Sequence, residues 1–242
     1  EEIETEEGDI ITAIEPQVQN FLEKKLMEVK EKYLVDLIGG IIMNPQDGSI
    51  YAMGVKPDFN PNNFSKTKTS TFSNPLVENV LEFGSVVKPL VMAGAIDAGV
   101  LTADTTYNDK GLVIVEKKEI TNFDKKGRGP GTSMQEVLNQ SLNTGMVFVE
   151  QKLGKEKMRD YLFSYGIKDK TGIDLPNETS GLVGNLNSPR EIEYANAAFG
   201  QGIALTPVEL IRALASLANG GNLVTPHIVQ EIKYDNGSSK KM

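Results

Sequence analysis

The sequence predicts a fold that combines helices with β-hairpins and is mainly helical between residues 84 and 220. Three observations predict it. Apolar residues recur at helical spacing in "EPQVQNFLEKKLMEVKEKY", residues 15–33. Two β-like runs flank a turn in "LIGGIIMNPQDGSIYAMGV", residues 37–55. From Gly84 onward, helical spacing returns in several separate segments.

The N-terminal part is expected to supply one helix and one hairpin. The chain opens with "EEIETEEGDI", and residues 1–12 are predicted to be an acidic linker or tail. Residues 13–55 then form the helix and the hairpin, whose turn lies at Asp47-Gly48. Residues 56–75 are predicted to be a polar loop.

The stretch from 84 to 220 carries the remaining helix signals. Pro89 is tolerated because it falls in the first turn of a helix that starts near Gly84. Thr132 or Ser133 can cap the next helix, and helical periodicity breaks near Asn143–Gly145. Further helices are predicted at 155–165, 189–199 and 206–218. Residues 221–242 are expected to return towards the sheet.

Composition excludes several classes of site. Hydrophobic residues make up 39% of the 242 residues and charged residues 24%, which is typical of a soluble globular protein. The net charge of −8, with scattered Lys and Arg, argues against a nucleic-acid partner. Without cysteine, and with His227 as the one histidine, we expect no disulfide, no metal site, no cofactor and no Ser-His-Asp triad. No apolar run is long enough for a transmembrane helix.

"VLEFGSVVKPLVMAGAIDAG", residues 80–99, places Ser85 and Lys88 three residues apart before an apolar run. That spacing puts both side chains on one helical face. Burial lowers the pKa of a lysine, so Lys88 could act as the base for a Ser85 nucleophile. Backbone N–H groups at the helix start would help to stabilise an oxyanion.

The Ser-x-x-Lys spacing alone is weak evidence. It also occurs at Ser65/Lys68, in a polar loop, and at Ser238/Lys241, in a polar tail. Only Ser85/Lys88 has a helix start and an apolar backing. An N-cap serine followed by a surface lysine would give the same pattern and is the commoner arrangement.

A second signal lies at the break in helical periodicity. "NQSLNTG" contains the chain's single Ser-x-Asn, Ser141-Leu142-Asn143. The Ser141 hydroxyl could relay a proton between the lysine and a leaving group, and the Asn143 amide could hold a substrate peptide bond. A polar connection between two helices remains the alternative interpretation.

The ordered pair "SVVK" and "SLN", 56 residues apart, resembles the transpeptidase domain of penicillin-binding proteins, of the monofunctional, class B-like type. "GGIIMNPQDGSIYAMG", "KTGIDLPNETSG" and "FGQGIALTPVELIRALASLANGG" also look like landmarks of that family. The resemblance implies an α/β lobe plus an all-α lobe, with an antiparallel sheet flanked by helices. It implies Ser85 as nucleophile, Lys88 as base, Ser141 as proton shuttle and Asn143 as binder of the substrate amide.

The family also carries Lys-Thr-Gly on a strand that lines the cleft. The one Lys-Thr-Gly here, Lys170-Thr171-Gly172, is followed by "IDLP" and lies in loop-like sequence, so we do not assign it that role. We expect the true strand to follow residue 242, and the chain to be truncated before it. The hairpin at 37–55 would then have unpaired edges and an uncovered face.

The resemblance implies a peptidoglycan D,D-transpeptidase that cross-links stem peptides through a serine acyl-enzyme and is inhibited by β-lactams. Implied partners are stem peptides, β-lactam antibiotics and cell-wall synthesis proteins. The implied location is the extracytoplasmic face of the bacterial cytoplasmic membrane, on an N-terminal anchor that this chain lacks. The alternatives are a β-lactam sensor or β-lactamase of the same fold, and a catalytically inactive cell-wall scaffold.

Three other groups are expected to be structural. His227 follows Pro226 in a β-like run, where a structural role is the commoner one. Asp174 and Glu178 resemble a carboxylate pair, but their loop-like context predicts capping and turning of the chain. The glycines of "FGQG" are expected to allow close backbone packing.

Overall fold

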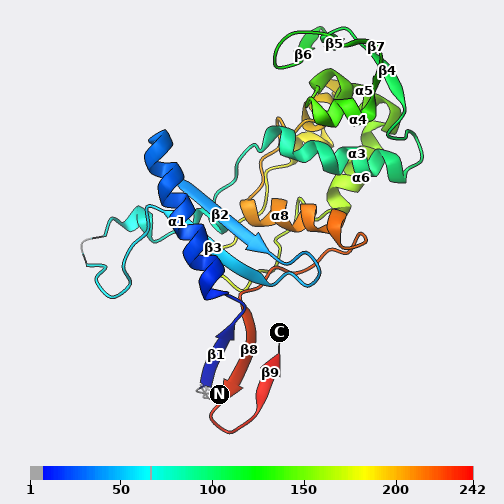
Figure 1. Cartoon of the computed structure of the whole chain (residues 1–242). Coiled ribbons are helices and arrows are strands. Elements are labelled where there is room, and N and C mark those ends of the chain that lie inside the picture. The colour runs from blue at the N-terminus through cyan, green and yellow to red at the C-terminus, as the bar shows by residue number, and fades with distance from the viewer. Residues whose placement is uncertain (1–7, 66, 242) are drawn as a thin grey trace. The chain divides into compact units, whose positions relative to one another are not determined.

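The computed structural model describes residues 8–65 and 67–241, which fall into two compact units (Figure 1). In the described residues, the first unit comprises 8–79, 170–179 and 206–241. The second unit comprises 80–169 and 180–205. The chain therefore leaves the first unit and returns to it twice.

The first unit contains two antiparallel sheets, with strand orders β1-β8-β9 and β2-β3. Its elements, with 3₁₀ helices written η, are β1 (Gly8–Thr12), α1 (Pro16–Tyr33), β2 (Ile38–Met43), β3 (Ile50–Lys56), η1 (Thr69–Thr71), α2 (Pro75–Glu78), α8 (Pro207–Ala215), η4 (Ser216–Ala218), β8 (Val229–Tyr234) and β9 (Ser239–Lys241).

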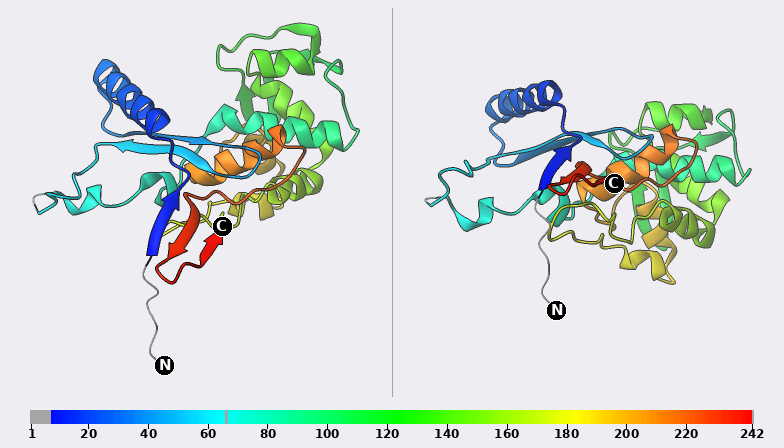
Figure 2. Two further views of the ribbon diagram at one scale, coloured as in Figure 1. Left: turned by 60° about the horizontal axis from the view of Figure 1, so that its bottom comes forward. Right: turned by 90° about the horizontal axis from the view of Figure 1, so that it is seen from below.

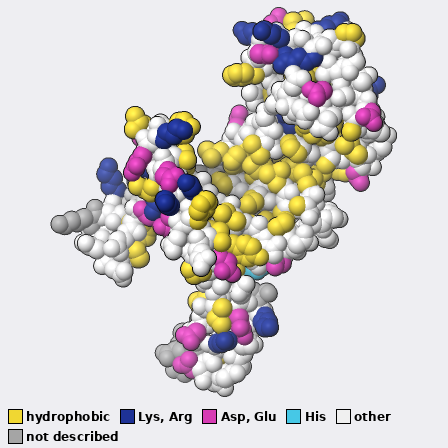
Figure 3. Space-filling model, in the orientation of Figure 1, with side chains coloured by type: hydrophobic (Ala, Val, Ile, Leu, Met, Phe, Trp, Pro, Cys, Tyr) yellow, Lys and Arg dark blue, Asp and Glu magenta, His cyan; other side chains and the backbone are white. Residues whose placement is uncertain are grey.

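The predicted hairpin is confirmed as the antiparallel pair β2 and β3. Its turn needs glycine at position 48, where φ is +88° and a Cβ atom would lie 2.3 Å from the Thr225 carbonyl oxygen. Among the described residues, β2 and β3 form no ladder with another strand. Hydrophobic side chains are visible on the surface over this hairpin (Figure 3), and Ile42 of β2 is 37% exposed.

The expectation of an uncovered face was wrong, because helices pack on both faces of this hairpin (Figure 2). On one face Gly40 and Gly54 lie under α1, and Cβ atoms there would lie 3.0 Å from Leu22 and 3.3 Å from Leu26. On the other face, β2 packs with α2 and α8. The core there consists of Ile50, Val77, Ile173 and Val208.

Two segments of the first unit differ from the expected organisation. Residues 8–12, expected in an acidic linker, form β1, because β8 supplies antiparallel backbone partners more than two hundred residues later in the sequence. Residues 1–7 of that expected linker lie outside the described residues. Helix α8, expected in the helical lobe, clusters with the first unit because Val208 completes its core.

The second unit is mainly helical, with the short antiparallel pairs β4-β7 and β5-β6. Its elements are η2 (Gly84–Val87), α3 (Lys88–Asp97), β4 (Thr106–Asp109), β5 (Leu112–Val115), β6 (Lys118–Thr121), β7 (Gly129–Ser133), α4 (Met134–Asn139), α5 (Asn143–Leu153), α6 (Lys155–Ser164), η3 (Gly184–Asn187) and α7 (Glu191–Ala197).

Helix α5 is the buried centre of the second unit, and α3, α6 and α7 pack around it. Met146, Val147 and Val149 of α5 are all buried. The helix starts follow the predicted capping chemistry, since the Ser133 hydroxyl accepts the Glu136 N–H at the start of α4. The described residues contain no helix with the length and apolarity that a bilayer crossing requires.

Candidate active site

Ser85, Lys88, Ser141 and Asn143 all belong to the second unit. Ser85 lies in the 3₁₀ turn η2, and Lys88 is the first residue of α3. Ser141 lies between α4 and α5, and Asn143 opens α5. The structure brings the two motifs together, although they are far apart in the sequence.

A chain of hydrogen bonds joins the four side chains. The Lys88 Nζ lies 2.9 Å from Ser141 Oγ and 2.8 Å from Asn143 Oδ1. It also lies 2.6 Å from the Ser141 carbonyl oxygen. The Ser141 hydroxyl lies 2.9 Å from Ser85 Oγ. The sequence predicts Lys88 as the base of Ser85 and Ser141 as a proton shuttle. In the structure the Ser141 hydroxyl is hydrogen-bonded to both Lys88 Nζ and Ser85 Oγ.

The local backbone explains how Ser85 and Lys88 share a face. A 3₁₀ helix has three residues per turn, so side chains at i and i+3 point the same way. Gly84 starts this turn with φ of +56° and donates its N–H to the Gly200 carbonyl. A Cβ atom at position 200 would lie 2.1 Å from the Gly84 carbonyl oxygen. The close backbone packing expected of "FGQG" therefore lies directly beside the residue that precedes Ser85.

Lys88 is buried, with 1% of its surface exposed, and is surrounded in α3 and η2 by buried apolar residues such as Val87 and Val91. Burial penalises the ammonium form and lowers the pKa of Lys88 to about 8. The three oxygen acceptors around Nζ match the three donors of an ammonium group. The site therefore supports both protonation states near neutral pH. Ser85, by contrast, is exposed and open to a substrate.

Ser141 adopts a left-handed backbone conformation, with φ of +54°. A non-glycine residue in this region costs on the order of 1 kcal/mol and persists only when its surroundings hold it. The Ser141 N–H donates to Leu138 O, and the next N–H, of Leu142, donates to Val137 O. The end of α4 therefore fixes the conformation that turns the Ser141 hydroxyl and carbonyl towards Lys88.

The Asn143 side chain is held from two sides. Its Oδ1 accepts from Lys88, and its Nδ2 donates to the Thr121 carbonyl at the end of β6, over 3.0 Å. An amide has two N–H donors and two acceptor lone pairs. One donor and one acceptor site of Asn143 therefore remain unused by these two hydrogen bonds.

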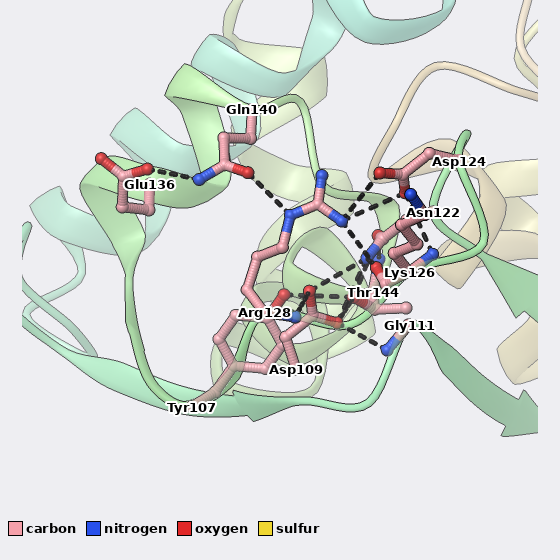
Figure 4. Close-up of polar contacts among 10 residues, drawn as sticks. All are labelled: Tyr107, Asp109, Gly111, Asn122, Asp124, Lys126, Arg128, Glu136, Gln140 and Thr144. Carbon is pink, nitrogen blue, oxygen red and sulfur yellow. Dashed lines mark hydrogen bonds and ion pairs between the residues drawn. The ribbon is translucent and has the colours of Figure 1, made fainter.

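The sequence does not single out the polar residues behind this centre. Buried Asp109, Asn122 and Thr144 form hydrogen bonds with one another next to Asn143 (Figure 4). Nothing in the local pattern separates Asp109 from the exposed Asp104 or Asp124. Only the three-dimensional contacts identify it.

The remaining candidate residues lie in the first unit and are structural. Lys170-Thr171-Gly172 is loop, as predicted, and the backbone N–H groups of Thr171 and Gly172 donate to Glu178. Asp174 accepts from the N–H groups of residues 228 and 229. His227 hydrogen-bonds Ser49 Oγ and the Thr225 carbonyl. Across residues 8–65 and 67–241, no group of three or more His, Cys, Asp or Glu is placed to hold a metal ion.

Comparison with known proteins identifies the family. The family model described as "Penicillin binding protein transpeptidase domain" matches residues 38–242. The chain belongs to this family. Stage V sporulation protein D of Bacillus subtilis is 34% identical over 92% of this chain and 35% of its own length. A peptidoglycan D,D-transpeptidase FtsI homologue of Mesostigma viride is 31% identical over 78% of this chain and 33% of its own.

These penicillin-binding protein relatives are longer, and the chain spans about a third of their length. Penicillin-binding protein 3 of Mycobacterium tuberculosis, in complex with aztreonam, superposes with a TM-score of 0.91. The superposition covers 97% of this chain and 52% of the other, at 22% sequence identity. The predicted fold, with antiparallel sheets flanked by helices and a helical lobe, is confirmed.

Proposed function

We propose that the protein is a serine-type peptidoglycan D,D-transpeptidase in which Ser85 is acylated by stem peptides. The observation that carries the proposal is the hydrogen-bond chain from exposed Ser85 through Ser141 to buried Lys88. A lysine with a pKa of about 8 can accept a proton near neutral pH. Curated relatives that bear the name peptidoglycan D,D-transpeptidase support the reaction class.

Acylation would follow the hydrogen-bond chain. Neutral Lys88 takes the Ser141 hydroxyl proton as Ser141 takes the proton of Ser85, and Ser85 Oγ attacks the D-Ala-D-Ala carbonyl carbon. When the tetrahedral intermediate collapses, the carbon–nitrogen bond breaks. The proton returns from Lys88 through Ser141 to the departing D-Ala amine. Asn143 would orient the substrate amide with its remaining donor and acceptor.

The oxyanion needs donors that are already in place. The Ser85 backbone N–H, just before α3, makes no hydrogen bond to the other described residues. We assign it as one oxyanion donor. In the second half-reaction, an amine of a neighbouring stem peptide attacks the ester carbon and gives a proton to the same relay. The carbon–oxygen bond to Ser85 then breaks, and the relay returns the proton to Ser85 Oγ.

One feature separates this function from a β-lactamase. Rapid hydrolysis of the acyl-enzyme needs a base that activates water. Within the described residues, the hydrogen-bond partners of the Ser85, Lys88, Ser141 and Asn143 side chains are the Lys88 amine and hydroxyl, amide and carbonyl groups. None is a carboxylate, so a long-lived acyl-enzyme is expected.

We further propose β-lactams as inhibitors, cell-wall synthesis proteins as partners, and the extracytoplasmic face of the cytoplasmic membrane as the location. Mycobacterial penicillin-binding protein 3, which shares the fold, has been crystallised with ampicillin and with aztreonam. A membrane-impermeant labelled penicillin should mark the full-length protein in intact cells. Cell-wall synthesis proteins should co-purify with it from solubilised membranes.

The test of function is acylation of the full-length protein. Intact-mass measurement after incubation with a penicillin should show one adduct of the penicillin's mass, persisting for minutes or longer, and absent from Ser85→Ala. Purified stem pentapeptide with an acceptor amine should give a cross-linked dimer and free D-Ala. Rapid loss of the adduct would favour a β-lactamase. No adduct from folded wild-type protein would favour a scaffold.

A further inference from the structure

We propose that residues 107–128 act as a brace that aligns the acyl-transfer centre, with Asp109 and Thr144 as positioning residues for Ser141 and Asn143. The inference rests on the proposed function of those two residues. It adds a cluster whose centre, at Asp109, Asn122 and Thr144, is buried. Figure 4 shows the cluster, which joins β4 and the segment after β6 to α4 and α5.

Asp109 is the anchor of the brace. It lies at the end of β4 with 1% of its surface exposed. Its carboxylate accepts from the backbone N–H groups of Gly111 and Arg128, from Asn122 Nδ2 and from the Thr144 hydroxyl, at 2.8–3.2 Å. A buried carboxylate is retained only when such donors replace its water. All four partners donate, so an amide at position 109 would set its own N–H₂ against a donor.

Thr144 connects this anchor to the Ser-x-Asn segment. Its N–H donates to Asn122 Oδ1 over 3.2 Å, and its hydroxyl lies 2.8 Å from Asp109 Oδ1. The hydroxyl also lies 3.1 Å from Asn122 Oδ1 and 3.1 Å from the Tyr107 hydroxyl. Its one proton is assigned to Asp109, because that contact is the shortest and the acceptor is a carboxylate. Thr144 then accepts from the Tyr107 hydroxyl. Burial raises the pKa of Tyr107 to about 12, which keeps that phenol a donor. The first turn of α5 is thereby fixed at the residue after Asn143.

The brace also holds the residue before Ser141. The Arg128 guanidinium donates to Gln140 Oε1 over 2.7 Å, and the Gln140 amide donates to Glu136 over 2.6 Å. Gln140 directly precedes the left-handed Ser141. Ser141 is therefore fixed from both sides, by Gln140 before it and by Asn143 and Thr144 after it.

Alignment here matters because every acceptor of Lys88 lies on this short segment. The Lys88 amine bonds Ser141 twice and Asn143 once. A shift of the start of α5 would lengthen these contacts and the Ser141–Ser85 contact together. Misplacement by about 1 Å can slow an enzymatic step on the order of 100-fold.

The test compares Thr144→Val with Thr144→Ser in the full-length protein. Valine keeps the volume and removes the hydroxyl, whereas serine keeps the hydroxyl. Asp104→Asn is the control for general effects, because Asp104 is exposed on the same stretch of chain and lies outside the cluster. Stopped-flow acylation by a fluorescent penicillin gives the maximal acylation rate constant, the apparent dissociation constant and the acylated fraction separately.

Thr144→Val should slow the maximal rate constant between about tenfold and 100-fold, with the dissociation constant and the acylated fraction near wild type. Thr144→Ser should restore most of the rate, and Asp104→Asn should match wild type. A wild-type rate constant in folded Thr144→Val would overturn the brace. So would a loss confined to the acylated fraction, which indicates unfolding alone.

Failure of the proposed function gives a different result, namely no acylation of wild-type protein. In that case amide hydrogen exchange at residues 140–146 tests whether the brace holds this segment. Thr144→Val should exchange faster there than Thr144→Ser, with unchanged protection in α6. Equal protection in the two variants would overturn the brace independently of catalysis.

Discussion

The pH dependence of acylation gives the sharpest test of the Lys88 assignment. Lys88 must lose its proton before it can accept one from the serine relay. Its pKa is lowered from 10.5 to about 8 by burial. Between pH 6 and 7.5, the fraction of neutral Lys88 should rise about tenfold per pH unit. The acylation rate constant should follow that rise and level off above pH 8.

The size of the effect follows from the same shift. At pH 7 about one tenth of Lys88 is neutral if its pKa is near 8, compared with about one in 3,000 for a lysine at 10.5. Burial thus increases the reactive form on the order of 300-fold. The shift also corresponds to about 3 kcal/mol between the two protonation states.

The assay is stopped-flow acylation from pH 6 to 9, with a penicillin whose carboxylate stays ionised throughout. Ser85→Ala supplies the background. Lys88→Arg keeps the positive charge but cannot lose its proton in this range, so it should be at least 100-fold slower at every pH. A flat profile from pH 6 to 9, or wild-type speed in a folded Lys88→Arg protein, would refute Lys88 as the base.

The lowered pKa has a consequence for stability. Between pH 8 and 10.5, the folded state binds fewer protons at Lys88 than the unfolded state, so stability should rise with pH across this window. Below pH 8 the cost of burying the charged Lys88 ammonium group is fully present, and it lowers the free energy of unfolding by up to about 3 kcal/mol. Lys88→Met removes the charge and should raise the unfolding free energy at pH 7 while abolishing acylation. A Lys88→Met protein less stable than wild type would contradict this prediction. It would mean that the three hydrogen bonds of Lys88 stabilise the fold by more than the burial of its charge destabilises it.

Two further predictions concern the second unit. Glu150 is 3% exposed, and burial, with Glu191 nearby, raises its pKa to about 7. The folded state therefore holds its proton more tightly than the unfolded state. Stability should fall by up to about 3 kcal/mol as pH rises from 4.5 through 7. Thermal unfolding of Glu150→Gln should lack this decline, and equal pH profiles would contradict the prediction. Gly200→Ala should lower the melting temperature more than Gly99→Ala does, and it should slow acylation. Both glycines have positive φ, but of the two only position 200 would place a Cβ atom within 4 Å of other backbone atoms. Equal losses of melting temperature in the two variants would show that the contact with Gly84 contributes nothing.

Local sequence chemistry predicts the individual elements well. Helix α1 begins at Pro16, near its predicted start, and the hairpin turn lies at Asp47-Gly48. Helix α8 begins with a complete capping box between Thr206 and Glu209. These features depend on residues within about four positions of one another, so the linear sequence contains the information.

Pairings between distant segments are not encoded in that way. "GDIIT" is short and has no alternation of polar and apolar residues, so it does not predict β1, which forms because β8 offers it hydrogen-bond partners. The same holds for α8, whose apolar face fits the core around Val208 rather than the helical lobe. Both outcomes depend on which surfaces meet, and periodicity alone does not specify that.

The same distinction between local and long-range information applies to the candidate site. The sequence by itself determined the candidate groups of the site: a serine and a lysine one turn apart, and a Ser-x-Asn at a helix break. Tertiary structure decided that Lys88 reaches Ser85 through Ser141, and that Asp109 and Thr144 stand behind Asn143. The physical reason is that hydrogen bonds depend on angstrom-scale placement and direction. The spacing of residues along the chain sets this placement and direction only within one turn of a helix.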